Sequence, residues 1–247
     1  MLNAVGRDIP EEILKATGKE VFQGTHHFDG HEFETASHKV KCVINSNGSK
    51  LVDSIHDVLV KCGIKDGMTL SFHHHFRNGD KVLNMVMEEV HAMGIKNITI
   101  CASSLGGQND PIVYMLDDGT ITNIESSGVR GEIGKAISNG RLQGLAIMRS
   151  HGARSRAIMS GETHIDIAFI GAPTADEYGN LNANGGKADC GVLSYSAVDA
   201  EYADRVVAVT DTLVPFPNLP AQISQVKVDY VVKVDEIGDP TKIATGA

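Results

Sequence analysis

The stretch TLSFHHHFRNGDKVLNMVMEEVHAMGIKNITI, residues 69–100, decides the fold of this chain. A short apolar strand runs into three histidines and an arginine. A predicted helix over residues 80–93 follows, and its apolar side chains recur at helical spacing: Val82, Met85, Val86, Val90 and Met93. Residues 97–100 then read as a second strand. A strand, a cationic loop and a helix N-terminus in this order are how α/β proteins build an anion site.

Outward from this stretch, predicted strands and helices alternate along the chain. The predicted strands cover residues 68–72, 97–102, 121–125, 145–148, 166–171, 206–210 and 228–234. The helical segments comprise an amphipathic stripe over residues 51–62 that stops at Gly63, and residues 80–93, 111–116, 132–138 and 154–159. This alternation predicts an α/β fold with a mostly parallel sheet flanked by helices.

Residues 1–50 lack this regularity. They contain scattered glycines, polar clusters and the segment HHFDGHEF, residues 26–33. We interpret them as an N-terminal extension with one or two short strands, and residues 51–247 as the one folded domain.

The composition limits the class of protein. With 42% hydrophobic and 21% charged residues, the chain is ordinary for a soluble globular protein. It has no apolar run of the roughly 18 residues that a membrane span needs, and no secretory leader, so we expect a cytoplasmic protein. The cysteines form no CxxC pair, which favours reduced thiols: Cys42, Cys62, Cys101 and Cys190.

The net charge of −9 argues against nucleic acid as a partner, because phosphate binding needs a basic surface. It does not exclude a small anionic substrate. Such a substrate requires that positive groups be concentrated locally, so that the field of the site differs in sign from that of the molecule.

The histidine loop is the first place where such groups gather. It contains His73, His74, His75, Arg77 and Asn78. In an extended segment, His73 and His75 point to one face and His74 to the other. A metal site, a structural role and contact with an anion or carboxylate remain open. The metal is disfavoured because no carboxylate or thiolate lies at a familiar ligand spacing, and anion contact is favoured by Arg77 and the free backbone N–H groups near Asn78 and Gly79. We therefore predict no metal in this chain.

A second polar loop follows the strand at residues 97–102. It contains Ser103, Ser104, Gly106 and Gly107. Two hydroxyls and two glycines at the carboxyl end of a strand suit a loop that lets the backbone approach a ligand. Without further context, an ordinary polar turn is slightly favoured.

A third cluster follows the strand at residues 145–148 and contains His151, Arg154 and Arg156. Cations at a helix N-terminus oppose the helix dipole, so a solvated helix start explains the three together poorly. A bound polycarboxylate would resolve the conflict, and a functional role is favoured here.

The acidic pair Asp176 and Glu177 follows the apolar strand at residues 166–171. Adjacent residues seldom share a face, so a structural role is favoured over paired catalytic carboxylates.

Longer motifs point to a family. The segments IDIAFIGAPTADEYGN, SSLGG and SGVRGE resemble those of the coenzyme A transferases, and the string SFHHHFRNGDKVLNMVMEEV resembles the α subunits of citrate lyase, the citrate CoA-transferases. The similarity runs over almost the whole chain. It implies the fold of the CoA-transferase type, which sugar-phosphate isomerases share, and a chain that corresponds to the first of two related lobes, with the second lobe absent.

The resemblance also implies an activity. Acetyl-[acyl carrier protein] and citrate would give citryl-[acyl carrier protein] and acetate, with the acyl group on a CoA-like phosphoribosyl-dephospho-CoA thiol and acetyl-CoA as a surrogate. The implied partners are the acyl carrier protein (γ) and citryl lyase (β) subunits of a multi-subunit complex. A covalent glutamate of related transferases would lie in the second lobe, and a mixed-anhydride route needs no such nucleophile.

This activity gives the polar loops expected roles. The histidine loop with Arg77 and Asn78, and the cluster of His151, Arg154 and Arg156, would bind the carboxylates of citrate. Ser103 and Ser104 with the Gly106–Gly107 backbone would stabilise negative charge on a carbonyl oxygen. Two alternatives remain: a sugar-phosphate isomerase of the same fold, and a non-catalytic module that assembles the lyase complex.

Overall fold

The computed structural model describes residues 1–23 and 48–243, which belong to two separate compact units. In the first unit, helix α1 (Glu11–Thr17) has two glutamates in its first turn and ends at Gly18 in the left-handed conformation. An isolated bridge joins Leu2 and Asp8. The expectation of short strands was therefore wrong for residues 1–23, where a helix forms instead. The HHFDGHEF segment lies outside the described residues.

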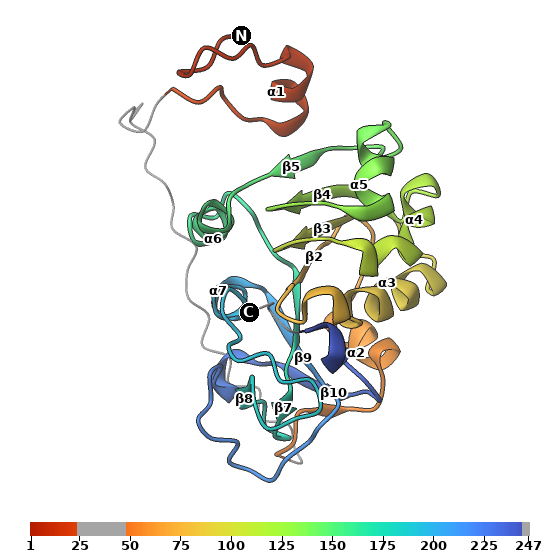
Figure 1. Ribbon diagram of the computed structural model, residues 1–247, viewed down its shortest axis with the longest axis vertical. Helices are drawn as coiled ribbons and strands as arrows, with labels where there is room; N and C mark the ends of the chain where they lie inside the picture. Colours follow the sequence, from red (N-terminus) through yellow and green to blue (C-terminus); the bar gives the residue numbers. More distant parts are fainter. Residues whose placement is uncertain (24–47, 244–247) are drawn as a thin grey trace. The chain divides into compact units, whose positions relative to one another are not determined.

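The second unit is built on an eight-stranded, fully parallel sheet (Figure 1). Its strand order is β1-β10-β9-β6-β2-β3-β4-β5. The strands are β1 (Leu51–Val52), β2 (Thr69–Phe72), β3 (Ile98–Ala102), β4 (Ile121–Ser126), β5 (Ala146–Met148), β6 (Ile167–Gly171), β9 (Arg205–Thr210) and β10 (Tyr230–Lys233). The prediction of an α/β fold with a parallel sheet is confirmed.

Helices cover both faces of this sheet (Figure 1). One face carries α2 (Ile55–Cys62), α3 (Val82–Ala92), α4 (Tyr114–Asp117) and α5 (Gly131–Ser138), and the other carries α6 (His151–Met159) and α7 (Ser196–Tyr202). The strand residues alternate accordingly: Ile167 and Phe169 pack with the first group, whereas Ala168 and Ile170 pack with the second. A strand buried on both faces is a nearly continuous apolar run, as in β6.

Local sequence signals fix several boundaries. Helix α2 begins after Ser54, whose side chain accepts a hydrogen bond from the Asp57 N–H, and ends at Gly63 with φ +71°. The predicted stop at Gly63 is confirmed. The stripe predicted over residues 51–62 divides, because Leu51 and Val52 pair with β10 as an edge strand before the helix begins.

Smaller elements connect the layers. These are a hairpin of β7 (Thr174–Ala175) and β8 (Leu181–Asn182), and the 3-10 turns η1 (Arg77–Gly79), η2 (Gly107–Ile112), η3 (Gln225–Lys227) and η4 (Pro240–Lys242). The sequence analysis did not predict the hairpin or α7. None of the helices among residues 1–23 and 48–243 has the length and apolar character that crossing a membrane requires.

The order in which the chain visits the strands creates a point in the sheet where a ligand site is expected. From β2 the chain builds outward through β3, β4 and β5, and it then returns to β6 on the other side of β2 before building outward to β9 and β10. The loops that leave β2 and β6 therefore diverge from neighbouring strands. In open α/β sheets, ligands bind at this switch point, beyond the carboxyl ends of the strands.

Candidate functional site

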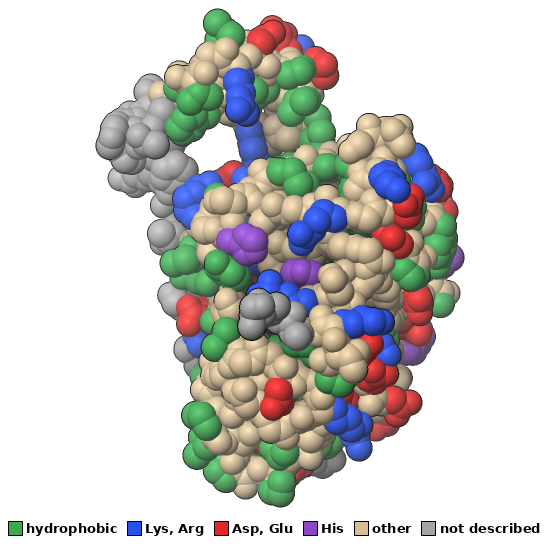
Figure 2. All heavy atoms as spheres, viewed as in Figure 1, with side chains coloured by type: hydrophobic (Ala, Val, Ile, Leu, Met, Phe, Trp, Pro, Cys, Tyr) green, Lys and Arg blue, Asp and Glu red, His purple; other side chains and the backbone are tan. Residues whose placement is uncertain are grey.

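A pocket of about 160 Å³ lies at this switch point. It is lined by the histidine loop after β2, the start of α6, the segment before α7 and one residue near the end of the described chain: His73, His74, His75, Arg77, His151, Cys190, Val192, Leu193, Ser194, Tyr195 and Ile243. Figure 2 shows histidine side chains and Lys or Arg side chains close together over the middle of the face drawn. The volume of the pocket is below the roughly 300–1,000 Å³ of sites for drug-sized ligands, so the pocket suits a small molecule.

The three histidines are held in fixed positions. The rings of His73 and His75 are stacked with centroids 6.0 Å apart, which confirms that these two share a face. The His75 Nε2 lies 2.8 Å from the Gly171 carbonyl oxygen at the end of β6, so this nitrogen carries the hydrogen. The backbone N–H of His74 donates to Ser103 Oγ at 2.8 Å. The histidine loop is thereby tied to the ends of both neighbouring strands.

Two of the imidazoles are neutral near pH 7. Burial, and after it the charges of Arg77 and Arg130, lower the pKa of His74 to about 4. Burial, and after it the neighbouring His73, lower the pKa of His75 to about 3. These side chains therefore offer N–H donors and lone pairs to a ligand rather than positive charge.

Positive charge at the pocket comes from Arg77, an exposed residue at φ +54°. Among the described residues, its side chain has neither a hydrogen bond nor an ion pair. Asn78 follows it on the surface of η1. The exposed Arg130 lies behind His74, with its Nη2 3.4 Å from Ser104 Oγ. Sequence reasoning missed Arg130, although it lies in the quoted SGVRGE segment.

The serine and glycine loop lies behind His74 and does not line the pocket directly. Ser103 Oγ accepts the His74 N–H, and the Ser104 hydroxyl donates to the Gly128 carbonyl at 3.3 Å. The Gly106 N–H donates to Asn109 Oδ1 at 3.1 Å, so it is not free for a substrate oxygen. Gly107 begins η2.

Beneath the pocket lies a buried ionic cluster. The guanidinium of Arg154 (3% exposed) forms two hydrogen bonds, of 3.0 and 2.6 Å, with the carboxylate of Asp199 on α7. Arg154 Nη2 also donates to Ser71 Oγ at 3.1 Å and to the Cys101 carbonyl at 3.3 Å. His73 Nε2 lies 3.2 Å from Asp199 Oδ2. Successive side chains of a strand point to opposite faces of the sheet, which explains why the Ser71 side chain of β2 points toward α6 and α7.

The three cations of α6 therefore have three different surroundings. His151 lines the pocket, with its ring 5.2 Å from that of Tyr195. Arg154 is buried against Asp199, and the exposed Arg156 pairs with Glu162. For the two arginines, the carboxylate partner that was expected from a ligand is therefore a side chain of the protein itself.

The acidic pair after β6 is divided between interior and surface. Asp176 is fully buried, and its carboxylate accepts hydrogen bonds from the backbone of Tyr178, Asn180 and Asn218. Glu177 is exposed. Asp176 closes the hairpin of β7 and β8, which agrees with the structural role favoured from the sequence.

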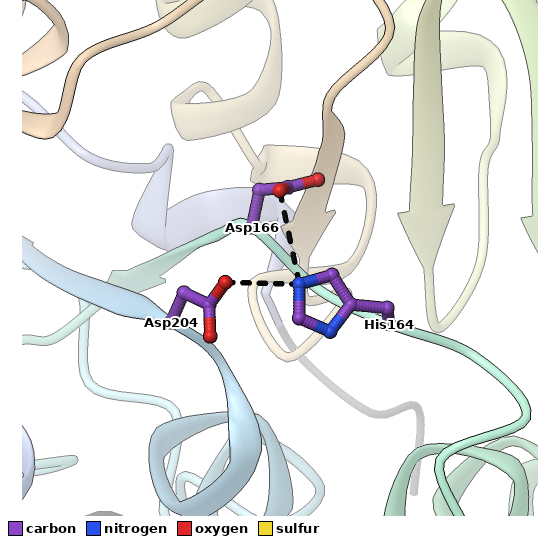
Figure 3. Close-up of side chains that lie close together, drawn as sticks. All are labelled: His164, Asp166 and Asp204. Carbon is purple, nitrogen blue, oxygen red and sulfur yellow. Dashed lines mark hydrogen bonds and ion pairs between the residues drawn. The ribbon is translucent and has the colours of Figure 1, made fainter.

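A separate cluster of a histidine and two carboxylates lies where β6 and β9 begin, and Figure 3 shows its three side chains. His164 Nε2 is 2.9 Å from Asp204 Oδ2 and 3.8 Å from Asp166 Oδ1. The second oxygen of Asp166 accepts the Thr69 N–H at 2.7 Å. Because these residues precede β6 and β9, the cluster joins the amino ends of neighbouring strands, away from the pocket.

Sequence reasoning missed several residues of the site. Tyr195, Ser194, Val192 and Leu193 line the pocket from the segment before α7, and Asp199 anchors the ionic cluster. The available signal was the aspartate in SAVDAEY, which lies between apolar residues and needs a buried partner. No sequence spacing connects it with Arg154, 45 residues away.

The fold is that of the coenzyme A transferases. Glutaconate coenzyme A-transferase from Acidaminococcus fermentans matches with a TM-score of 0.56 at 13% identity, covering 75% of each chain. An acyl-CoA transferase from Escherichia coli matches with a TM-score of 0.58 at 15% identity, covering 81% of this chain and 49% of that one. At these identities the likeness concerns the fold alone.

The chain belongs to the citrate lyase alpha subunit family, whose model matches residues 48–247. It is 48% identical to the citrate lyase alpha chain of Haemophilus influenzae over 198 residues, covering 80% of this chain and 40% of that protein. The putative alpha subunit of citrate lyase from Streptococcus mutans, solved in complex with citrate, matches with a TM-score of 0.90 at 49% identity, covering 99% of this chain and 47% of that one. The resemblance identified from the sequence is confirmed. The chain spans less than half the length of these relatives.

Proposed function

We propose that this chain forms the carboxylate-binding lobe of a citrate CoA-transferase. The reaction exchanges acyl groups on a thiol, so that acetyl-[acyl carrier protein] and citrate give citryl-[acyl carrier protein] and acetate. Membership of the citrate lyase alpha subunit family supports this proposal, as does the citrate complex of the Streptococcus mutans protein.

One observation carries the proposal: a small pocket at the switch point combines uncharged imidazoles with an arginine, Arg77, that has no partner among the described residues, in a protein of net charge −9. Arg77 supplies a guanidinium that can hold a carboxylate through two hydrogen bonds. His74, with a pKa of about 4, adds an N–H donor without a strong positive field, whereas His75, with a pKa of about 3, donates its Nε2–H to Gly171 and offers the ligand only a lone pair. His151 and Asn78 complete the proposed carboxylate contacts.

The serine and glycine loop keeps its proposed role toward the reacting carbonyl oxygen. Ser103 Oγ contacts the His74 backbone, Ser104 Oγ lies near Arg130, and Gly107 follows in the same loop. An oxygen that becomes negative in the transition state would be stabilised by such preorganised donors. Arg154 acts on the ligand only through the protein groups that it binds, and Arg156, which pairs with Glu162 away from the pocket, has no role in binding.

The acyl donor is a large thioester substrate. We propose that it is carried on the CoA-like phosphoribosyl-dephospho-CoA group of the acyl carrier protein, with acetyl-CoA as a surrogate. A pocket of about 160 Å³ fits the acyl end and a small acid, so the rest of the group must lie outside it. The wider complex with carrier protein and citryl lyase subunits, and a cytoplasmic location, remain predictions.

Calorimetric titration of the chain with citrate tests the binding step. Charged hydrogen bonds contribute about 1.5–3 kcal/mol, so Arg77→Ala should weaken citrate binding by roughly 10- to 100-fold. Arg156→Ala is the matched control, because this exposed arginine pairs with Glu162 away from the pocket, and it should bind citrate as the wild type does. Equal affinities of both variants would remove Arg77 from the site.

Acetate release from acetyl-CoA and citrate tests the reaction itself. The relatives are more than twice as long as the matched segment, so we expect little exchange by this chain alone. Addition of the remaining part of the Haemophilus influenzae citrate lyase alpha chain, as a separate polypeptide, should raise the rate. Citrate binding with no exchange under either condition would favour an assembly module.

A further inference from the structure

Asp199 is a fully buried carboxylate beneath the pocket, and it contacts one pocket residue. Its two oxygens bind Arg154, and Oδ2 also accepts a hydrogen bond from the Ser71 hydroxyl. The same Oδ2 lies 3.2 Å from His73 Nε2. One side chain on α7 therefore links α6, β2 and the first histidine of the pocket.

Stability alone does not explain this arrangement. A buried ion pair costs several kcal/mol of desolvation per ion, and packed apolar residues in its place are often neutral or stabilising. A pair that served only to join α6 to α7 could be replaced by such residues. What an apolar pair cannot supply is a hydrogen-bond acceptor for the imidazole of His73.

The charge state of Asp199 decides which hydrogen His73 carries. Burial alone would raise the pKa of Asp199, but the Arg154 guanidinium and His73 hold it well below its usual range. The carboxylate is therefore ionised near pH 7 and can only accept hydrogen bonds. An imidazole nitrogen that faces it at 3.2 Å must carry its hydrogen there, at Nε2.

His73 is well placed to transmit this constraint to a ligand. Its side chain is only 3% exposed, and it still lines the pocket and stacks on His75. The Nε2 contact with Asp199 is within ion-pair distance but lacks the alignment of a full hydrogen bond. With Nε2–H directed to Asp199, Nδ1 presents a lone pair, which can accept a hydrogen bond from a hydroxyl group of the ligand.

We propose that Asp199 is a positioning residue, which fixes the Nε2–H form and the ring orientation of His73, and that Arg154 is its buried counter-ion. The consequence for binding rests on the proposed function, since the ligand would be citrate, whose hydroxyl group can donate to the Nδ1 lone pair of His73. The consequence for the ring of His73, which carries its hydrogen at Nε2, does not depend on the proposed function. Arg154 then acts two layers away from the ligand and makes no contact with it.

The ¹⁵N resonances of the His73 ring, read without ligand, test the first consequence. The wild type should show the Nε2–H form, whereas Asp199→Asn should show a mixture of both neutral forms. Because Asp199→Asn leaves Arg154 unpaired, the double variant Asp199→Asn with Arg154→Met provides a second, uncharged version of the same change. An unaltered Nε2–H form in a folded Asp199 variant would overturn the proposal.

Citrate titration tests the second consequence. Introduced into the wild-type chain, Asp199→Asn should weaken citrate binding about 10-fold. Introduced into the His73→Gln variant, it should have no further effect. The control is Asp229→Asn, because Asp229 is also buried and lies 3.6 Å from an arginine, Arg205, but has no contact with the pocket. An equal loss with and without His73 would overturn the positioning role. If the chain bound no citrate at all, the proposed function would fail while the ¹⁵N result still decided the role of Asp199.

Discussion

Replacing Arg154 with alanine should destabilise the fold severely, even though the residue lies at the start of a surface helix. The change removes two hydrogen bonds to Asp199 and leaves a fully buried carboxylate without its counter-ion. Breaking a buried ion pair by removing one partner costs about 3–5 kcal/mol. That is a large part of the roughly 5–15 kcal/mol by which native domains are stable.

The same helix provides an internal control. Arg156 lies two positions further along α6, but its side chain is 54% exposed and its partner Glu162 is 28% exposed. Exposed pairs contribute about 0–1 kcal/mol. Arg156→Ala should therefore change the free energy of unfolding by less than about 1 kcal/mol.

Urea unfolding followed by far-ultraviolet circular dichroism, together with thermal melts, measures both effects. A loss of about 3–5 kcal/mol corresponds to a melting temperature lowered by roughly 6–20 °C for a domain of this size. Adding Asp199→Asn to an Arg154→Met background should recover much of the loss, because no uncompensated charge then remains. If Arg154→Ala and Arg156→Ala were equally stable, or if neutralising Asp199 gave no recovery, the description of the buried pair would be refuted.

Three further predictions follow from individual contacts. Burial raises the pKa of Asp80 to about 7, so the folded protein holds a proton that the unfolded chain releases near pH 4. Between these two pH values, the free energy of unfolding should fall by roughly 1.4 kcal/mol per pH unit as pH rises. Urea titrations at several pH values should show this slope in the wild type and not in Asp80→Asn. An unchanged slope would exclude the protonated form. Burial raises the pKa of the Cys190 thiol to about 12, so iodoacetamide at pH 8 should label it much more slowly in the folded protein than in urea, as peptide mass spectrometry would show; equal rates would contradict this. A Cβ at Gly171 would lie 2.4 Å from Phe76 Cε2, so Gly171→Ala should cost about 1–3 kcal/mol in thermal melts, whereas Gly152→Ala, in open space on α6, should be neutral or stabilising.

The fold was largely predictable because its signals are local. The apolar run of β6 and the helical spacing after Lys81 each depend on residues close in sequence, and the parallel sheet follows from their alternation. The elements that were missed lack such signals. Helix α7 is short, and the two strands of the hairpin have only two residues each, with a turn at Gly179 that is held by the buried Asp176.

The candidate site was predictable only in part. His73, His74 and His75 were correctly placed at a strand end beside Ser103, because the carboxyl ends of neighbouring parallel strands meet at one edge of the sheet. Their charge was not predictable, since burial holds two of the three imidazoles neutral. Tyr195 was not singled out either, because it reaches the pocket from a segment more than 100 residues further along the chain.

The class of fold, the family and the end of the strands where polar loops gather can all be deduced from the order of the amino acids, because periodicity and motif order are properties of neighbouring residues. The sequence also showed that the cations of α6 needed a negative partner. The identity of that partner depends on which residues the folded chain places beside α6. The packing of α6 against α7 brings Asp199 to Arg154 in the buried interior, and the low polarity of that interior strengthens the pairing between the protein's own carboxylate and the arginine that the sequence had assigned to a ligand.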